Sequence, residues 1–292
     1  MGIDAFLAQV LSGLATGGIY ASVALALVMI YQATHLVNFA QGELAMFATY
    51  IAWSLMQAGV PYWGAFAATV AVAFVLGVLI ERVIVQPVEN APILSIVIVF
   101  IGLLVILNSL AGWIFTYTIK PFPSPFPEQP IFGNAYVGPH ELGSIGVTLA
   151  VLVAVFVFFR FTPLGLAMRA AAQNPVSSRL VGIRVGWMLA LGWGLAAAIG
   201  AIAGIMVAPS VFLEPNMMAG ILLYAFAAAL LGGIDNPWGA VAGGLIVGVV
   251  ENLAGTYVVG TELKLTLALV LIVGVLLIRP SGLFGRKLVA RV

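Results

Sequence analysis

The chain of 292 residues is 63% hydrophobic and only 7% charged, and its formal net charge is +1. A soluble domain of this size could not cover its surface with so few charged side chains. A membrane span needs about 20 apolar residues, so we predict an all-α, polytopic membrane protein with about eight or nine transmembrane helices. The low net charge argues against a nucleic-acid-binding surface. The absence of cysteine excludes disulfides and Cys-ligated metal sites.

The predicted spans are the long apolar runs of the sequence. They lie at about residues 6–31, 44–56, 63–80, 93–115, 145–159, 187–211, 219–231, 239–250 and 265–278. Glu251 follows the eighth run, and we expect it to mark the end of that helix. The shorter runs at 44–56 and 219–250 could instead be half-helices or re-entrant segments, because many transport sites are built from broken helices.

Pairs of glycines spaced four residues apart occur in several of these runs, as at Gly13 and Gly17 and again at Gly200 and Gly204. Small residues at this spacing allow helix backbones to approach closely in lipid. Glycine is common in membrane helices, so we interpret these pairs as ordinary packing positions.

Residues 32–43, QATHLVNFAQGE, form a polar interruption between the first two apolar runs. They could form a cytoplasmic turn, or a break in the helix inside the bundle, where protein or a water-filled cavity must satisfy the backbone. Glu43 at the end of this stretch is equally consistent with a functional carboxylate and with an interfacial one. The segment ERVIVQPVENAP, residues 81–92, is expected to be a polar connector.

The longest predicted loop is residues 116–144, which contain prolines at 121, 123, 125, 127, 130 and 139. Proline at this density disfavours regular helix and favours an extended, stiff segment. We therefore expect a surface loop that covers the mouth of the bundle.

The longest polar interruption in the second half of the chain is residues 163–184, PLGLAMRAAAQNPVSSRLVGIR. Asn174 can cap a helix that begins at Pro175, and Gly182 suits its left-handed C-terminal end. The side chains of Val176, Leu180 and Val181 fall on one side of this short helix. It could contact a soluble partner, or it could lie on lipid headgroups.

The distribution of Lys and Arg predicts the topology. With nine spans and a cytoplasmic C-terminus, nine basic residues face the cytoplasm and two, Lys120 and Lys264, lie outside. The nine are at positions 82, 160, 169, 179, 184, 279, 286, 287 and 291. The opposite orientation reverses this count, so the N-terminus is predicted outside, with residues 116–144 outside and 163–184 in the cytoplasm.

No motif of nucleotide or metal chemistry is present. The sequence contains no GxxxxGK[ST], HExxH or GxSxG, so we expect no catalytic residue and no metal site. The charges crowd at the predicted span ends, whereas an ion-coupled secondary transporter usually keeps ionisable residues inside its spans. An energy source on a partner chain is therefore favoured over a secondary transporter or channel that works without ATPase partners.

Several stretches together resemble a LivH-type permease of the branched-chain amino acid ABC transporter family. They occur in family order and cover nearly the whole chain: GGIYASVALALVMIY with VNFAQGE, ERVIVQPVENAP, PLGLAMRAAAQNPVSSRLVGI, AFAAALLGGIDNPWGAVAGGLIVGVVE and LLIRPSGLFG. The resemblance implies a single permease domain over residues 1–292 in a bacterial inner membrane. It also implies a second homologous (LivM-like) permease, two cytoplasmic (LivG/LivF-like) ATPase subunits that bind ATP and Mg, and an extracytoplasmic substrate-binding protein.

The resemblance also assigns candidate residues. It implies that the loop at 163–184 contacts an ATPase through Met168, Arg169, Gln173, Asn174, Pro175, Ser178, Arg179, Val181 and Gly182. The candidates for the translocation pathway are Asn38, Gln41, Glu43, Glu214, Asn216 and Tyr224.

The chain departs from the family pattern at two polar positions. Gln41 stands where the family usually has His, and Tyr224 stands where Lys is common. Relatives in this family carry urea and short amides as well as amino acids, so the solute is left open between these classes.

Overall fold

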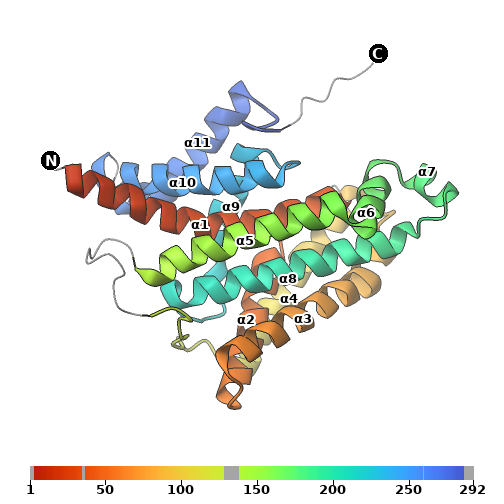
Figure 1. Ribbon diagram of the computed structural model, residues 1–292, viewed down its shortest axis with the longest axis horizontal. Coiled ribbons are helices and arrows are strands. Elements are labelled where there is room, and N and C mark those ends of the chain that lie inside the picture. Colours follow the sequence, from red (N-terminus) through yellow and green to blue (C-terminus); the bar gives the residue numbers. More distant parts are fainter. Residues whose placement is uncertain (1–2, 35–36, 128–137, 259, 286–292) are drawn as a thin grey trace. The chain divides into compact units, whose positions relative to one another are not determined.

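The computed structural model describes residues 3–34, 37–127, 138–258 and 260–285. Within these ranges the protein is helical, as predicted, and its one pair of β-bridged residues is Lys120 and Leu213. The longer helices are α1 (Ile3–Thr34), α2 (Gln41–Gln57), α3 (Tyr62–Ile80), α4 (Ile93–Phe115), α5 (Pro139–Phe161), α6 (Pro163–Gln173), α8 (Val185–Val211), α9 (Met217–Gly232), α10 (Pro237–Tyr257) and α11 (Lys264–Ile278). The short helix α7 is Pro175–Leu180 (Figure 1).

Six of these helices are long and apolar enough to cross a membrane in the described part of the chain. They comprise α1, α3 with its continuation to Val88, α4, α5, α8 and α10. Helices α9 and α11 are apolar but shorter, and α2 has 17 residues. A multi-pass membrane protein follows from these helices, while eight or nine spans and the orientation of the termini stay predictions.

Three expected boundaries are wrong. Helix α10 continues to Tyr257, so Glu251 lies inside it. Helix α5 begins at Pro139, because proline at the first helical turn loses no hydrogen bond. Residues 81–88 continue α3 as the π-helix Glu81–Val85 and the 3-10 helix Gln86–Val88, so only the end of the expected connector is irregular. The centre of the predicted proline-rich loop, residues 128–137, lies outside the described residues.

The chain folds into two compact units, each built from segments that are distant in the sequence. Unit 1 contains residues 1–28, 124–149 and 220–292. In it, the backbone of α1 approaches that of α10 at the predicted glycines: a Cβ added to Gly13 would lie 2.7 Å from Val249 Cα, and one added to Gly17 would lie 2.8 Å from Gly244 O. The close packing expected at these glycines is therefore confirmed.

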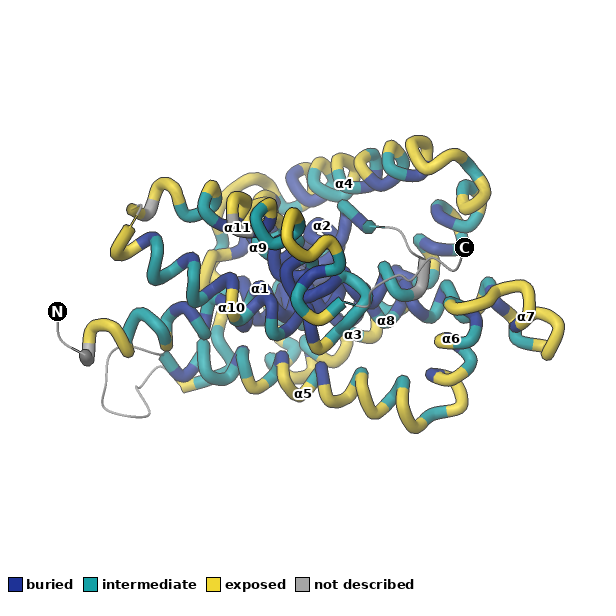
Figure 2. Tube along the Cα trace, turned by 90° about the horizontal axis from the view of Figure 1, so that it is seen from above, coloured by how far each residue is buried: buried dark blue, intermediate teal, exposed yellow. Residues whose placement is uncertain are grey.

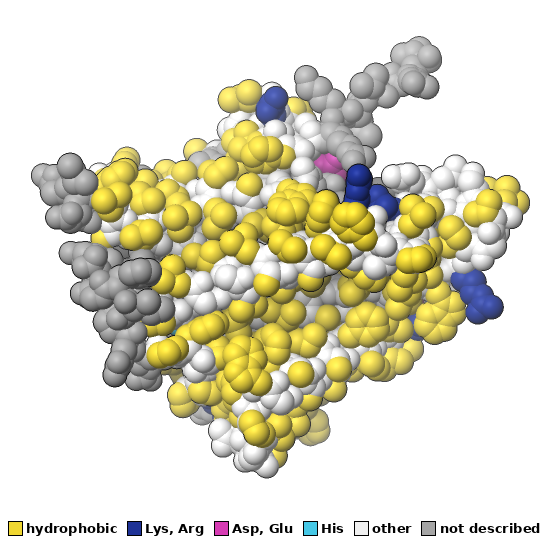
Figure 3. All heavy atoms as spheres, in the orientation of Figure 1, with side chains coloured by type: hydrophobic (Ala, Val, Ile, Leu, Met, Phe, Trp, Pro, Cys, Tyr) yellow, Lys and Arg dark blue, Asp and Glu magenta, His cyan; other side chains and the backbone are white. Residues whose placement is uncertain are grey.

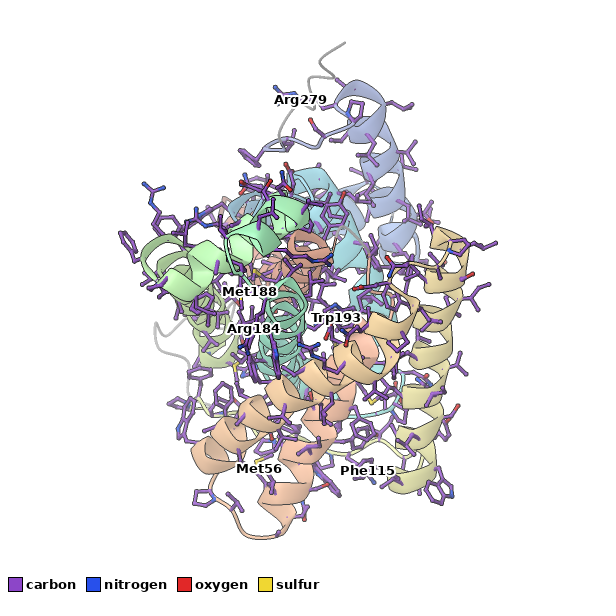
Figure 4. All side chains as sticks on the ribbon, turned by 90° about the vertical axis from the view of Figure 1, so that its right-hand side faces the viewer. Met56, Phe115, Arg184, Met188, Trp193 and Arg279 are labelled. Atoms are coloured by element: carbon purple, nitrogen blue, oxygen red, sulfur yellow. The ribbon has the colours of Figure 1, made fainter. Side chains whose placement is uncertain are left out.

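Unit 2 contains residues 29–123 and 150–219. Helix α8 is its central element, and α2, α3 and α6 pack against it (Figure 1). Trp193 of α8 is fully buried, and its ring centroid lies 5.6 Å from that of Phe100 on α4. Figure 4 labels Arg184, which precedes α8, and Met188 and Trp193, which belong to it.

Close contact between α2 and α8 also depends on glycine. A Cβ added to Gly204 of α8 would lie 2.5 Å from Ala45 O and 2.5 Å from Thr49 Oγ1, both on α2. The outer faces of α3 and α4 carry exposed apolar side chains, for example Val75 and Ile106. Figure 3 shows such side chains over the visible parts of α3 and α8, as expected of helices that contact lipid or another apolar surface.

Candidate functional site

The first part of the predicted coupling loop is α6, an amphipathic helix of 11 residues. It begins after Thr162, whose hydroxyl oxygen accepts a hydrogen bond from the Gly165 amide at 3.0 Å. Gly165, Met168 and Ala171 are buried at positions three residues apart, on the face that α6 turns toward the rest of unit 2. This buried face fixes α6 on the bundle.

Helix α7 follows with the ends predicted from the sequence. The Asn174 side-chain oxygen accepts a hydrogen bond from the Ser177 amide at 2.9 Å, and Pro175 is the first helical residue. At the other end Gly182 has a φ of 87°, and its amide donates to the Arg179 carbonyl while the Ile183 amide donates to the Ser178 carbonyl. These are the two bonds of a Schellman motif, so α7 is closed at both ends by its own residues.

The apolar side chains of α7 do not pack into the bundle. Val176, Leu180 and Val181 are 68%, 84% and 76% exposed. Figure 2 shows most of α7 in the exposed colour. Among the nine candidate coupling residues Met168 and Ser178 are buried, so these two can only support the loop. The exposed ones are Arg169, Gln173, Asn174, Pro175, Arg179, Val181 and Gly182.

The chain that leaves α7 enters α8 beside the end of α3. The Arg82 guanidinium lies 4.3 Å from the centroid of the Trp187 ring, a distance at which a cation is attracted to an aromatic face. Arg82 belongs to the π-helix Glu81–Val85, and such segments are frequent at functional sites. The Arg82–Trp187 contact thus joins the start of α8 to the continuation of α3.

The polar break before α2 lies inside unit 2. Asn38 in the break and Gln41 at the start of α2 have no exposed surface, and Glu43 in the first turn of α2 is 5% exposed, so the buried alternative is confirmed for this part of the stretch. Asn38 Oδ1 accepts a bond from the Ala40 amide, and Gln41 Nε2 donates to the Ala196 carbonyl of α8 at 3.1 Å. The buried polar groups are thus satisfied by neighbouring protein. His35 lies outside the described residues.

Glu43 and Asn216, two of the pathway candidates, meet at Asn108 of α4. The Asn108 Nδ2 atom lies 3.3 Å from Glu43 Oε2, 3.0 Å from the Pro215 carbonyl oxygen and 3.2 Å from Asn216 Oδ1. We refer to Glu43, Asn108, Pro215 and Asn216 as the polar cluster. Glu214, the neighbouring candidate, is half-buried.

Sequence reasoning missed Asn108. The available signal was an amide in the middle of the run at 93–115, which is otherwise almost entirely apolar. A polar side chain within a membrane span is a functional hypothesis by default.

An antiparallel bridge lies beside the polar cluster. The Lys120 amide donates to the Leu213 carbonyl at 2.9 Å, and the Leu213 amide donates back at 3.0 Å. Thr116, after α4, and Phe212, after α8, have φ of 64° and 63° with ψ of 164° and 157°. Backbone in this region is adopted almost only by glycine, so both residues are strained. The bridge holds residues 213–216 where Pro215 and Asn216 can reach Asn108.

Residues 9–276 match a family described as "Branched-chain amino acid transport system / permease component". The chain belongs to this family. It is 32% identical over 304 residues to the high-affinity branched-chain amino acid transport system permease protein LivH of Escherichia coli, with 98% of each chain covered. It is also 32% identical to the permease protein BraD of Pseudomonas aeruginosa, again with 98% of each chain covered. A solved structure of PsaBC from Streptococcus pneumoniae in complex with Fab gives a TM-score of 0.47 at 14% identity, covering 89% of this chain and 88% of the other.

The last pathway candidate of this permease, Tyr224, lies in unit 1. Its ring stacks on that of Tyr20 with 4.7 Å between centroids, and the Tyr20 hydroxyl donates to Glu251 Oε2 at 2.8 Å. The structure therefore places Tyr224 with a different carboxylate from the one at Asn108. In the described part of the permease, no group of three or more His, Cys, Asp or Glu side chains could hold a metal ion.

Proposed function

We propose that this permease is the membrane-spanning subunit of an ATP-driven ABC importer for branched-chain amino acids or related small polar solutes. It pairs with a second, homologous permease in a bacterial inner membrane. Two cytoplasmic ATPase subunits bind ATP and Mg and drive the cycle. An extracytoplasmic binding protein delivers the solute. Transport by this subunit would then consist of binding and conformational change, with ATP hydrolysis on its partners.

The observation that carries this proposal is the form of α6 and α7. Helix α6 is fixed to unit 2 by a buried face, whereas α7 is capped by its own residues and exposes Leu180 and Val181 beside Arg179. An exposed, rigid, apolar and cationic segment is suited to contact a protein surface. The lipid-headgroup alternative accounts for the amphipathic face but gives no reason for a helix with both ends closed.

The positions of the cations in unit 2 support the proposed orientation. Arg82 contacts Trp187 near the start of α8, and Lys120 pairs with Leu213 just after its end. Helix α8 has 27 residues, so these ends are about 40 Å apart. Arg169, Arg179 and Arg184 all precede the start of α8, the end that contacts Arg82. This is the distribution expected if α8 begins on the cytoplasmic side.

We propose alternating access as the mechanism. Closure of the ATPase dimer would displace α7, and α6 with the Arg82–Trp187 contact would pass this displacement to α8 and α3. Because α2 contacts α8 at Gly204 and Gln41, a shift of α8 would alter the surroundings of the polar cluster. Asn38, Gln41, Glu43, Glu214 and Asn216 would line or gate the pathway in unit 2, with Tyr224 in unit 1.

Cross-linking tests the α7 contact directly, because the chain contains no cysteine. Leu180→Cys, at a position that is 84% exposed, should cross-link to an ATPase subunit through a short thiol-to-amine reagent in the assembled complex. Tyr117→Cys is the control: it is 58% exposed but lies in the loop proposed to be outside. Cross-linking of Tyr117→Cys to an ATPase subunit, or no such cross-link from Leu180→Cys, would contradict the proposed coupling.

Uptake into proteoliposomes tests the energy source. We expect solute uptake to require the ATPases, ATP and the binding protein, and Arg179→Glu to abolish uptake while ATP hydrolysis continues. Arg160→Glu makes the same change of charge on α5, outside the loop, and should retain uptake. Transport by this chain alone under an ion gradient would instead establish a secondary transporter.

A further inference from the structure

The polar cluster presents an unequal number of donors and acceptors. Three oxygens, from Glu43, Pro215 and Asn216, lie 3.0 to 3.3 Å from the single nitrogen Asn108 Nδ2. A side-chain amide nitrogen carries two protons. At least one of the three oxygens therefore lacks a proton from Asn108 at any moment.

A primary ammonium group could supply a proton to each of the three oxygens. It carries three N–H donors and no acceptor, and its positive charge complements a carboxylate. A nitrogen placed where Asn108 Nδ2 now lies could donate one proton to each oxygen. Neutral urea and amides offer only two protons on each nitrogen and no charge.

Glu43 also lacks a cationic partner. Its side chain is 5% exposed, and within the described ranges the one ion pair closer than 4.0 Å joins Arg82 to Glu81. Burial of a carboxylate without a counter-ion is unfavourable, so a ligand cation at this point would complete the site.

The cluster is exposed at one of its members. Asn216 is exposed and Asn108 is half-buried, while Glu43, in the first turn of α2, is 5% exposed. Leu213, two residues before Pro215, forms the bridge with Lys120, and the Asn216 carbonyl accepts a hydrogen bond from the Ala219 amide in the first turn of α9. Asn216 therefore marks the side of the cluster that a ligand nitrogen could reach.

We propose that the polar cluster is a receptor for the primary ammonium group of the transported solute, with the Asn108 amide as its occupant when no solute is bound. This inference rests on the proposed transport function and narrows its substrate class. It selects amino acids over urea and neutral amides. Asn108 competes with the solute, whereas Glu43 attracts it.

Binding to the assembled complex in lipid nanodiscs, without the binding protein, tests the proposal. The probes are L-leucine and 2-hydroxy-4-methylpentanoate, which differ only in ammonium against hydroxyl, together with urea. Saturation-transfer NMR would measure each affinity. We expect the wild-type complex to prefer leucine by about tenfold or more, since hydrogen bonds to charged groups are the stronger ones.

Two variants should change leucine binding in opposite directions. Glu43→Gln should remove the preference for leucine over its hydroxy analogue. Asn108→Ala should strengthen leucine binding several-fold, because no internal amide has to be displaced. Glu89→Gln neutralises an exposed carboxylate of unit 2 and should leave the preference unchanged. A merely structural cluster would weaken in both variants, so loss of binding in Asn108→Ala would overturn the proposal.

The remaining outcomes are equally decisive. Equal affinity for leucine and its hydroxy analogue, competition by urea at similar concentration, or no binding of leucine would each count against an ammonium receptor. ATP-driven uptake is measured on the same preparations. Intact uptake with an unchanged preference in Glu43→Gln refutes this inference alone, whereas absence of ATP-driven uptake refutes the proposed function.

Discussion

The loop of α6 and α7 and the buried break before α2 lie in the same unit but are held together in different ways. Helix α7 is closed by bonds between residues at most five positions apart, and its apolar side chains are exposed. Gln41 and Glu43 are buried and bond to residues 155 and 65 positions away. The break therefore depends on the packed unit, while the loop keeps its form by itself and has its apolar face free for a partner.

This comparison predicts that changes at the break act on folding, and changes at the loop act on coupling. The expected loss in the free energy of unfolding decreases from the helix contact beside the break, through the break itself, to the cap and then the exposed face of α7.

Gly204→Val should have the largest effect. Its side chain would overlap Ala45 O and Thr49 Oγ1, and overpacking against backbone should cost about 3 kcal/mol or more. Thermal unfolding in detergent measures the loss. Gly102→Val is the matched control, because a Cβ at Gly102 meets nothing within 4 Å. Equal stability of the two variants would show that α2 and α8 are not in close contact.

Gln41→Leu should destabilise unit 2 by about 1–2 kcal/mol, because the hydrogen bond to the Ala196 carbonyl is lost in a buried site. The same unfolding measurement applies. Gln57→Leu, at an exposed position near the end of α2, should change stability little. A smaller loss of unfolding free energy in Gln41→Leu than in Gln57→Leu would show that the break does not depend on the packed unit.

Asn174→Ala should cost about 1 kcal/mol locally, the usual value of a lost N-cap. Hydrogen exchange of the Ser177 amide, which donates to Asn174 Oδ1, should accelerate about fivefold while the rest of unit 2 stays protected. Asn174→Asp retains a capping oxygen and should restore protection. Faster exchange throughout α8 would mean that the loop is not independent of the bundle.

Leu180→Ser should have the smallest effect on stability, within about 0.5 kcal/mol, because the side chain is 84% exposed. ATP-driven uptake should nevertheless fall more than in any of the preceding controls. Ser177→Ala, also on α7, should affect neither quantity. Normal uptake by Leu180→Ser would leave the exposed apolar face without a role.

The same contrast explains what could be predicted from the sequence. The caps at Asn174 and Gly182 are readable because each depends on residue type at a fixed local spacing. Asn108 was missed because its partners Glu43 and Asn216 lie 65 and 108 residues away, and nothing near Asn108 in the sequence identifies them.

The misplaced end of α10 has a related cause. A charged residue after an apolar run suggests an interface, so the sequence predicts that the helix ends at Glu251. In the structure the Tyr20 hydroxyl donates to this carboxylate from another helix of unit 1, which allows α10 to continue past it. Local hydropathy cannot reveal such a distant donor.

The bridge between Lys120 and Leu213 has a consequence for solute passage. It consists of two backbone hydrogen bonds, each contributing about 0.5–1.5 kcal/mol, and it is flanked by two residues whose backbone geometry costs about 1–3 kcal/mol each. If separation of Lys120 from Leu213 relaxed both residues, the strain released would be at least comparable with the two hydrogen bonds lost. The bridge is therefore weak on balance, and a protein bound to residues 213–216 would need little differential affinity to favour a form in which Lys120 and Leu213 are apart.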